Sequence, residues 1–70
     1  MPGSDDEARR LERMMDQLSD AQRAAVTLFY YEDRSVDEVA GLLGMPENTV
    51  KTHLSRARAT LRRALERGAA

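Results

Sequence analysis

Basic residues near the C-terminal end of this sequence are the groups whose chemistry is plainest. Residues 51–70 hold six bases against one acid, whereas residues 1–50 hold five bases against eleven acids. The six bases are Lys51, Arg56, Arg58, Arg62, Arg63 and Arg67. Cations gathered on one segment of an otherwise acidic chain attract polyanions to that segment. The sequence therefore predicts a polyanionic partner that is held by a single element.

The spacing within this segment predicts a helix with two different faces. At about 100° per residue, one stripe is apolar and consists of Val50, Leu54, Ala57 and Leu61. The opposite strip is small or polar and consists of Asn48, Thr52, Ser55 and Ala59. It is flanked by Lys51, Arg56, Arg62 and Arg63, while Arg58 lies nearer the apolar boundary. Such a helix suits the major groove of DNA, because small side chains permit close approach, flanking cations reach phosphates, and one or two read guanine O6 and N7.

The residues just before this helix predict a helix-turn-helix over residues 36–55. Ala40 is small enough for two helices to cross closely, and Gly44 supplies the backbone freedom that a tight turn needs. Pro46 stops the first helix, and Met45 and Val50 are apolar where the two helices share a core. A small residue, a glycine four residues later and a valine six residues after that are spaced as expected for a DNA-binding helix-turn-helix.

Local signals along the rest of the chain predict an all-α fold. Ser4, Ser19 and Ser35 are each followed three residues later by Glu or Gln, the pattern of a capping box. The helices are expected at about 5–18, 20–31, 36–43 and 47–66. They would form a small helical bundle of about four helices with a C-terminal helix-turn-helix. We expect residues 1–4 to be a flexible N-terminus or a cloning remnant, residues 5–67 to be the domain, and residues 68–70 to be a flexible C-terminus.

The composition excludes several classes of function. Seventy residues allow one domain with a small core, in which we expect Phe29 and one of the two tyrosines, Tyr30 or Tyr31, to pack. The absence of cysteine excludes disulfides, and no nucleophile, acid–base pair, phosphate loop or metal-ligand spacing is present, so we expect neither an enzyme nor a cofactor. The one histidine, His53, is expected to pack at the core boundary. No apolar run approaches the roughly 18 residues of a membrane span, so we expect a cytoplasmic protein and no membrane partner.

Five short runs of the sequence together resemble a known family. They are Leu-Ser-Asp-Ala-Gln-Arg at 18–23, Ser-Val-Asp-Glu-Val-Ala at 35–40, Leu-Gly-Met-Pro at 43–46, Asn-Thr-Val-Lys-Thr-His-Leu-Ser-Arg-Ala-Arg at 48–58 and Leu-Arg at 61–62. These runs resemble region 4 of bacterial sigma-70-type factors, and most of all the extracytoplasmic-function class. The resemblance covers about residues 15–65. It implies a domain that recognises the promoter −35 element, docks on the flap of the RNA polymerase β subunit, and can be bound by an anti-sigma factor.

The resemblance also assigns roles to single positions. Lys51, Thr52, Ser55 and Arg56 align with the groove-facing positions of the recognition helix. Pro46, Glu47, Asn48 and Thr49 align with the turn and the helix start, which approach the phosphate backbone. The resemblance further implies that an apolar groove between the second and third helices would suit the tip of the polymerase flap or an anti-sigma factor. Glu47 is a poor neighbour for phosphate unless it accepts from a base amino group, such as cytosine N4, or points aside.

Two other functions remain open at this point. The run at 49–54 would suit the output domain of a LuxR-type regulator equally well, although such domains place a dimerising helix after a break and no break is expected here. A basic helix could also bind an acidic protein. The chain departs from the sigma pattern at Ser19, where proline is common, and at Arg34, where glycine is common. The −10-binding sigma domain has no counterpart in these residues, so we expect either an excised piece or a stand-alone relative.

Overall fold

The computed structural model describes the backbone of residues 2–69 and the side chains of residues 7–67. Its elements are four α-helices and one short π-helical segment: α1 (Pro2–Met15), α2 (Asp20–Val26), η1 (Thr27–Tyr31), α3 (Val36–Leu43) and α4 (Glu47–Ala69). No strand occurs within the described residues. The predicted all-α class and the predicted C-terminal pair of helices are confirmed.

Two capping boxes fix the starts of α2 and α3. The Ser19 hydroxyl accepts from the Gln22 N–H at 3.2 Å, and the Gln22 side-chain oxygen accepts from the Ser19 N–H at 3.3 Å. Ser35 and Glu38 make the same reciprocal pair at 3.2 and 3.1 Å. Each box satisfies two backbone donors that the first turn of a helix leaves without partners. The boxes predicted at Ser19 and Ser35 are confirmed.

Helix α1 differs from its prediction at both ends. It begins at Pro2, so Ser4 lies inside the helix and the predicted start at residue 5 is wrong; the Ser4 side chain is outside the described residues. It ends at Met15 rather than at the predicted Leu18. There the Gln17 N–H donates to the Met14 carbonyl at 3.1 Å and the Leu18 N–H to the Met15 carbonyl at 3.0 Å. These tighter bonds end the α-helix and turn Leu18, which is 4% exposed, into the core.

The helix predicted over residues 20–31 has the expected limits, but it changes from α-helical to π-helical hydrogen bonding after Val26. Residues 20–26 are α-helical, whereas in η1 the Glu32 N–H donates to the carbonyl five residues earlier, at Thr27 and 3.1 Å. Asp33 then takes a left-handed conformation with φ 56°, and the Arg34 N–H donates back to the Leu28 carbonyl at 3.0 Å. Aspartate tolerates this conformation better than most residues. The chain therefore reverses toward α3 directly after η1.

The turn between α3 and α4 is built around Gly44. This residue has φ 65° and ψ 39°, and it is the one glycine with positive φ in the described residues. The N–H groups of Gly44 and Met45 both donate to the Ala40 carbonyl, the latter at 3.1 Å. The Pro46 carbonyl then accepts from the Val50 N–H at 3.1 Å and begins α4. Two residues therefore separate the left-handed glycine from the next helix, the short connection that a helix-turn-helix requires.

The buried core consists mainly of alanine and valine side chains, with two leucines. Its buried members are Leu18, Ala25, Val26, Val39, Ala40, Val50, Leu54 and Ala57. Met15, Leu28, Phe29, Val36, Leu43, Met45 and Leu61 pack against them while partly exposed. The inward faces predicted for α3 and α4 are thus confirmed. The expectation of a core tyrosine is wrong, because Tyr30 and Tyr31 are 48% and 61% exposed and only Phe29 packs inward.

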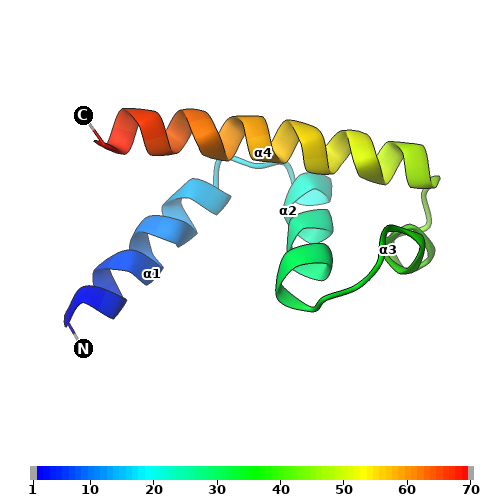
Figure 1. Cartoon of the computed structure of the whole chain (residues 1–70), viewed down its shortest axis with the longest axis horizontal. Helices are drawn as coiled ribbons and strands as arrows, with labels where there is room; N and C mark the ends of the chain where they lie inside the picture. The colour runs from blue at the N-terminus through cyan, green and yellow to red at the C-terminus, as the bar shows by residue number, and fades with distance from the viewer. Residues whose placement is uncertain (1, 70) are drawn as a thin grey trace.

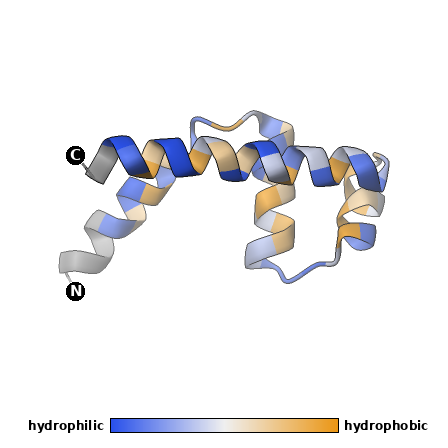
Figure 2. Cartoon of the chain, turned by 45° about the horizontal axis from the view of Figure 1, so that its top comes forward, coloured by the Kyte–Doolittle hydropathy of each residue, from blue (hydrophilic) through white to orange (hydrophobic). Residues whose placement is uncertain are grey.

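Helix α4 spans the whole molecule and contacts each of the other helices (Figure 1). Its 23 residues correspond to about 35 Å at 1.5 Å per residue, close to the longest dimension of 38 Å. Helices α1, α2 and α3 all lie on the same side of it in Figure 1. Much of the opposite side of α4, which comes forward in Figure 2, is hydrophilic. One long face of α4 is therefore left uncovered by the rest of the domain.

Replacing Gly44 by alanine should lower the free energy of unfolding by about 1–2 kcal/mol, because a Cβ disfavours the left-handed conformation. No atom lies within 4 Å of the position of that Cβ, so the expected loss is conformational and not steric. Gly41 is the matched control. It is exposed within α3, has no positive φ and has equal space, so Gly41→Ala should raise the stability by about 0.5–1 kcal/mol. Urea unfolding of both variants measures the contrast, and shifts of the same sign would contradict it.

The capping box at Ser35 should make stability depend on acid pH. The Ser35 backbone N–H, followed by the Arg34 guanidinium, holds the pKa of Glu38 below its ordinary value of 4.5. A carboxyl with a lowered folded pKa adds stability above the unfolded value and loses it as pH falls through the folded value. Glu38→Gln, which keeps the box without titrating, should flatten the decline of melting temperature below about pH 4.5.

Gln22→Glu is the reciprocal variant for this experiment, because it places a carboxyl in the equivalent box at Ser19. It should steepen the same decline. Identical acid profiles for the wild-type chain and Glu38→Gln would show that the Glu38 carboxylate is not held by the box.

Candidate nucleic-acid interface

All ten residues predicted to contact DNA are exposed. Pro46 lies directly before α4, and the other nine lie on it: Glu47, Asn48, Thr49, Lys51, Thr52, Ser55, Arg56, Arg62 and Arg63. The buried stripe Val50, Leu54 and Ala57 faces the other helices, so the opposite side carries the predicted strip. We call Asn48, Thr52, Ser55 and Ala59 the outer strip of α4. At about 100° per residue, the four flanking cations lie on both sides of this strip.

Glu47 is the predicted contact on α4 that lies farthest from the outer strip around the helix axis. At about 100° per residue it lies about 110° from the centre of the strip, toward the side of α4 that the scaffold covers. Its position favours the alternative in which this carboxylate points aside from phosphate. Its place in the first turn also suits the helix dipole, which favours a negative charge at the N-terminal end.

Arginines of α4 divide into two groups by their partners. The Arg58 guanidinium donates to the Tyr30 hydroxyl at 2.8 Å, and the Arg67 guanidinium donates to the Gln17 side-chain oxygen at 3.1 Å. The one ion pair among the described side chains joins Arg34 and Glu38 at 3.3 Å. The remaining cations of α4 make no side-chain hydrogen bond or ion pair within the described part of the chain: Lys51, Arg56, Arg62 and Arg63. These four coincide with the four that flank the outer strip.

Distance along the helix separates these four cations further. Lys51 and Arg56 lie within about 6 Å of Thr52 along the axis, whereas Arg62 and Arg63 lie about 15 Å or more beyond it at 1.5 Å per residue. A straight helix that enters a groove about 8.5 Å deep leaves it again over such a length. The geometry therefore suits Lys51 and Arg56 for base edges or nearby phosphates, and Arg62 and Arg63 for phosphates farther along.

Two polar side chains of α4 differ in their hydrogen bonds. The Thr52 hydroxyl donates to the Asn48 carbonyl at 3.0 Å. His53 is half-buried beside the apolar stripe, and its Nδ1 atom is buried without a hydrogen-bond partner among the described residues. The position of His53 agrees with the boundary packing expected from the sequence.

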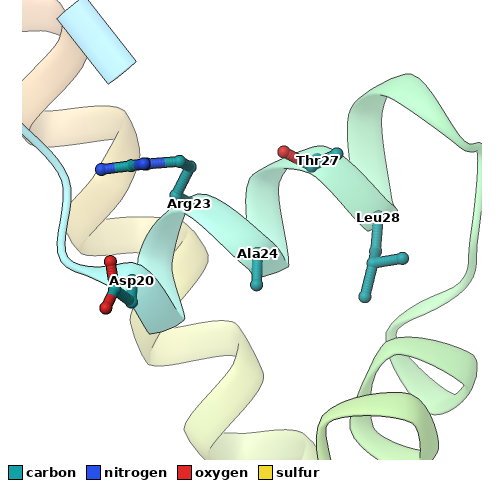
Figure 3. Close-up of a pocket in the computed structure, with 5 residues that line it drawn as sticks. All are labelled: Asp20, Arg23, Ala24, Thr27 and Leu28. Carbon is teal, nitrogen blue, oxygen red and sulfur yellow. The ribbon is translucent and has the colours of Figure 1, made fainter. Parts of the chain in front are cut away.

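Hollows in the surface lie outside the outer strip, although the second one reaches Arg62 on its flank. One is lined by Asp20, Arg23, Ala24, Thr27 and Leu28, all on one face of α2 and η1 (Figure 3). No α3 residue lines it, so it is not the groove expected between the second and third helices. A second hollow, of about 480 Å³, lies between α1, η1 and α4. We call it the α1–α4 groove; its lining is mainly apolar and consists of Leu11, Met15, Val26, Tyr30, Tyr31, Arg58, Leu61, Arg62 and Leu65.

Sequence reasoning missed the contacts that hold α4 to the scaffold through polar atoms. Tyr30 and Arg58 are 28 residues apart, and Gln17 and Arg67 are 50 apart. The periodicity of α4 did place Arg58 nearer the apolar boundary, but nothing local identifies its partner. Groups of three or more potential metal ligands are absent from the described side chains. Among the described helices, none combines the length and apolarity needed to cross a membrane.

A tight turn built on a left-handed glycine, a second helix anchored by an apolar stripe and an uncovered strip with unpaired cations define a helix-turn-helix DNA-binding domain. The family model described as "Sigma-70, region 4" matches residues 8–61, most of the chain. The chain therefore belongs to the sigma-70 region 4 family, whose members are non-enzymatic, promoter-recognising domains of transcription initiation.

Individual relatives agree with this assignment. The chain is 47% identical over 49 residues to the RNA polymerase sigma-E factors of Streptomyces avermitilis and Streptomyces antibioticus, a match that covers 70% of this chain and 27% of each relative. It is 38% identical over 60 residues to the probable RNA polymerase sigma factor RfaY of Xanthomonas campestris pv. campestris, covering 86% of this chain and 15% of that relative. The chain thus spans about a quarter or less of the length of these relatives. The similarity to sigma-E factors supports the extracytoplasmic-function class predicted from the sequence.

Arg56 and Arg58 form a matched pair for mutagenesis, because they carry the same charge on the same helix and differ in their partners. Arg56→Ala should weaken binding to a −35 duplex by about 1–3 kcal/mol if the guanidinium reads a base, and should weaken binding to a scrambled duplex less. Arg58→Ala should act chiefly on the melting temperature, through loss of the Tyr30 contact. Fluorescence anisotropy at fixed salt measures both affinities, and equal losses for the two variants on both duplexes would contradict the division.

Proposed function

We propose that this chain binds duplex DNA at the promoter −35 element as the region 4 domain of an extracytoplasmic-function sigma factor, with α4 in the major groove. The observation that carries this proposal is the outer strip of α4, which is small and polar, uncovered, and flanked by four cations that have no partner within the described residues. It begins directly after the helix-turn-helix turn, where a recognition helix contacts base edges with its first residues.

Each predicted contact residue takes a role that follows from its place on α4. Lys51, Thr52, Ser55 and Arg56 face base edges, because they lie in the first turns on or beside the outer strip. Pro46, Asn48 and Thr49 approach the phosphates beside the turn. Arg62 and Arg63 reach the phosphate backbone farther along the helix. Glu47 completes the helix start and points aside from phosphate. The folded unit that does this is the domain of residues 5–67, and its place of action is the cytoplasm, where promoter DNA lies.

The α1–α4 groove is the proposed attachment to RNA polymerase, through the flap of the β subunit. Several of its large apolar side chains are exposed in the isolated domain: Leu11 (39%), Tyr30 (48%), Tyr31 (61%) and Leu65 (48%). An apolar patch on a domain this small indicates a partner surface. A single helix-turn-helix binds DNA weakly alone, and a second attachment raises the effective concentration of the first. An anti-sigma factor that covers the same groove would remove that second attachment.

Different observations argue against the two alternatives that the sequence left open, a LuxR-type domain and a module that binds acidic proteins. A LuxR-type domain would need a break before a dimerising helix, and α4 runs without interruption from Glu47 to Ala69. A module that binds acidic proteins would not need the small outer strip between its cations. Neither alternative has support among the relatives named above, which are two sigma-E factors and one probable sigma factor.

Salt dependence and sequence preference together test the proposed function. With about five phosphates neutralised, the logarithm of the association constant should fall with the logarithm of salt concentration with a slope of roughly −4 to −5. The chain should also bind duplexes selected from a random pool more tightly than scrambled ones. Equal affinity for selected and scrambled duplexes, at every salt concentration, would contradict promoter recognition and leave only a non-specific polyanion site.

A further inference from the structure

Thr52 occupies the middle of the outer strip and is exposed. Its neighbours along the strip are Asn48, Ser55 and Ala59, none of which has a long side chain. No long side chain of the strip therefore holds a base edge away from Thr52. The residue can make direct contact with a base pair if α4 enters a major groove.

The hydroxyl proton of Thr52 is already used within the helix. Oγ1 donates to the Asn48 carbonyl one turn earlier, at 3.0 Å. Threonine in a helix commonly takes such a bond, and its two remaining Cβ substituents are then a hydrogen and a methyl group. Thr52 in this state cannot donate to guanine O6 or N7, adenine N7 or thymine O4. Oγ1 can still accept a hydrogen bond from a base amino group, but the apolar group that Thr52 offers to a base is the γ-methyl.

We infer that Thr52 determines specificity by placing its γ-methyl group against the 5-methyl group of a thymine. This inference rests on the proposed function, which it deepens by naming the base that one residue reads. The thymine methyl is the one apolar group that base pairs display in the major groove, and threonine methyl groups pair with it. Contact between the two removes apolar surface from water on both sides.

The experiment removes the thymine methyl and nothing else. Binding sites for the full 70-residue chain are first selected from a random duplex pool. Each thymine of the selected site is then replaced, one at a time, by deoxyuridine. One replacement should weaken binding about fourfold, the ratio that corresponds to about 0.8 kcal/mol for one buried methyl group.

Two variants of Thr52 separate its methyl from its hydroxyl. Thr52→Val keeps a methyl and removes the hydroxyl, so the fourfold deoxyuridine penalty should remain. Thr52→Ser keeps the hydroxyl and removes the methyl, so the penalty should disappear. Thr60→Ser is the matched control: it makes the same chemical change on α4 at a half-buried position away from the outer strip, and the penalty should stay fourfold. Because the penalty is a ratio within one variant, a change in folded fraction cancels.

Three results would overturn the inference while leaving the proposed function standing: a deoxyuridine penalty that persists in Thr52→Ser, a selected site whose affinity does not respond to any deoxyuridine, or a Thr52→Val variant that loses preference at an adenine or cytosine. The last result would assign Oγ1 as an acceptor for a base amino group. Failure of the proposed function looks different, because no sequence would then be enriched from the pool, and both ideas would fall.

Discussion

Burial of the apolar stripe of α4 is the constraint on which the rest of this domain depends. Val50 and Ala57 are completely buried, and Leu54 is 3% exposed. Burying a valine or leucine side chain contributes about 1.5–3 kcal/mol, a large share of the 5–15 kcal/mol that is typical of a whole domain. Helix α4 therefore cannot rotate about its axis without losing much of the stability of the fold. Because side chains leave a helix at fixed angles, the same burial decides which residues form the outer strip.

The scaffold holds α4 along its length rather than at one end. Helix α3 and the turn at Gly44 set its beginning, α2 crosses its first half, and α1 contacts it farther along (Figure 1). Most of the buried core side chains are alanine or valine, so the helices can approach one another closely. Beyond the main core, Ala64 is buried and Arg67 donates to Gln17. These contacts attach the 23-residue helix to the small domain along its length, and so fix the orientation of a binding surface made of one helix.

The sequence predicted those features of the fold whose cause is local. The capping boxes at Ser19 and Ser35 involve residues three apart, and the inward stripes of α3 and α4 follow from the helical period. The glycine turn at Gly44 is local in the same way. The π-helical winding of η1 has no such signature, because α-helical and π-helical turns use the same residues and differ in which carbonyl each N–H meets. The contact of Tyr30 with Arg58 could not be predicted from the sequence either, because it depends on how α4 crosses the other helices.

The same division applies to the candidate interface. Helical angles in the sequence separated the outer strip from the apolar stripe, and the exposure of all ten predicted residues agrees with that separation, although contact with DNA remains a prediction. The helical angles could not predict which hydrogen-bond partner each polar group has. Arg58 donates to a tyrosine on another element, and the Thr52 hydroxyl donates to a backbone carbonyl of its own helix. The angular positions of residues around α4 do not predict either hydrogen bond.

Hydrogen bonds within the domain reduce the number of cations on the basic segment 51–70 that are available to a polyanion. The charge of this segment suggested six cations available to a polyanion, but Arg58 and Arg67 are bound to Tyr30 and Gln17 and help to hold α4 in place. Four cations then remain beside the outer strip, and most of the acidic residues lie on the helices behind α4. A polyanion that approaches from the scaffold side meets like charge, whereas one that approaches the outer strip meets opposite charge. The uneven charge along the chain thus places positive charge on one side of the folded domain. It favours the orientation of the domain on DNA in which the small side chains of α4 can reach a base.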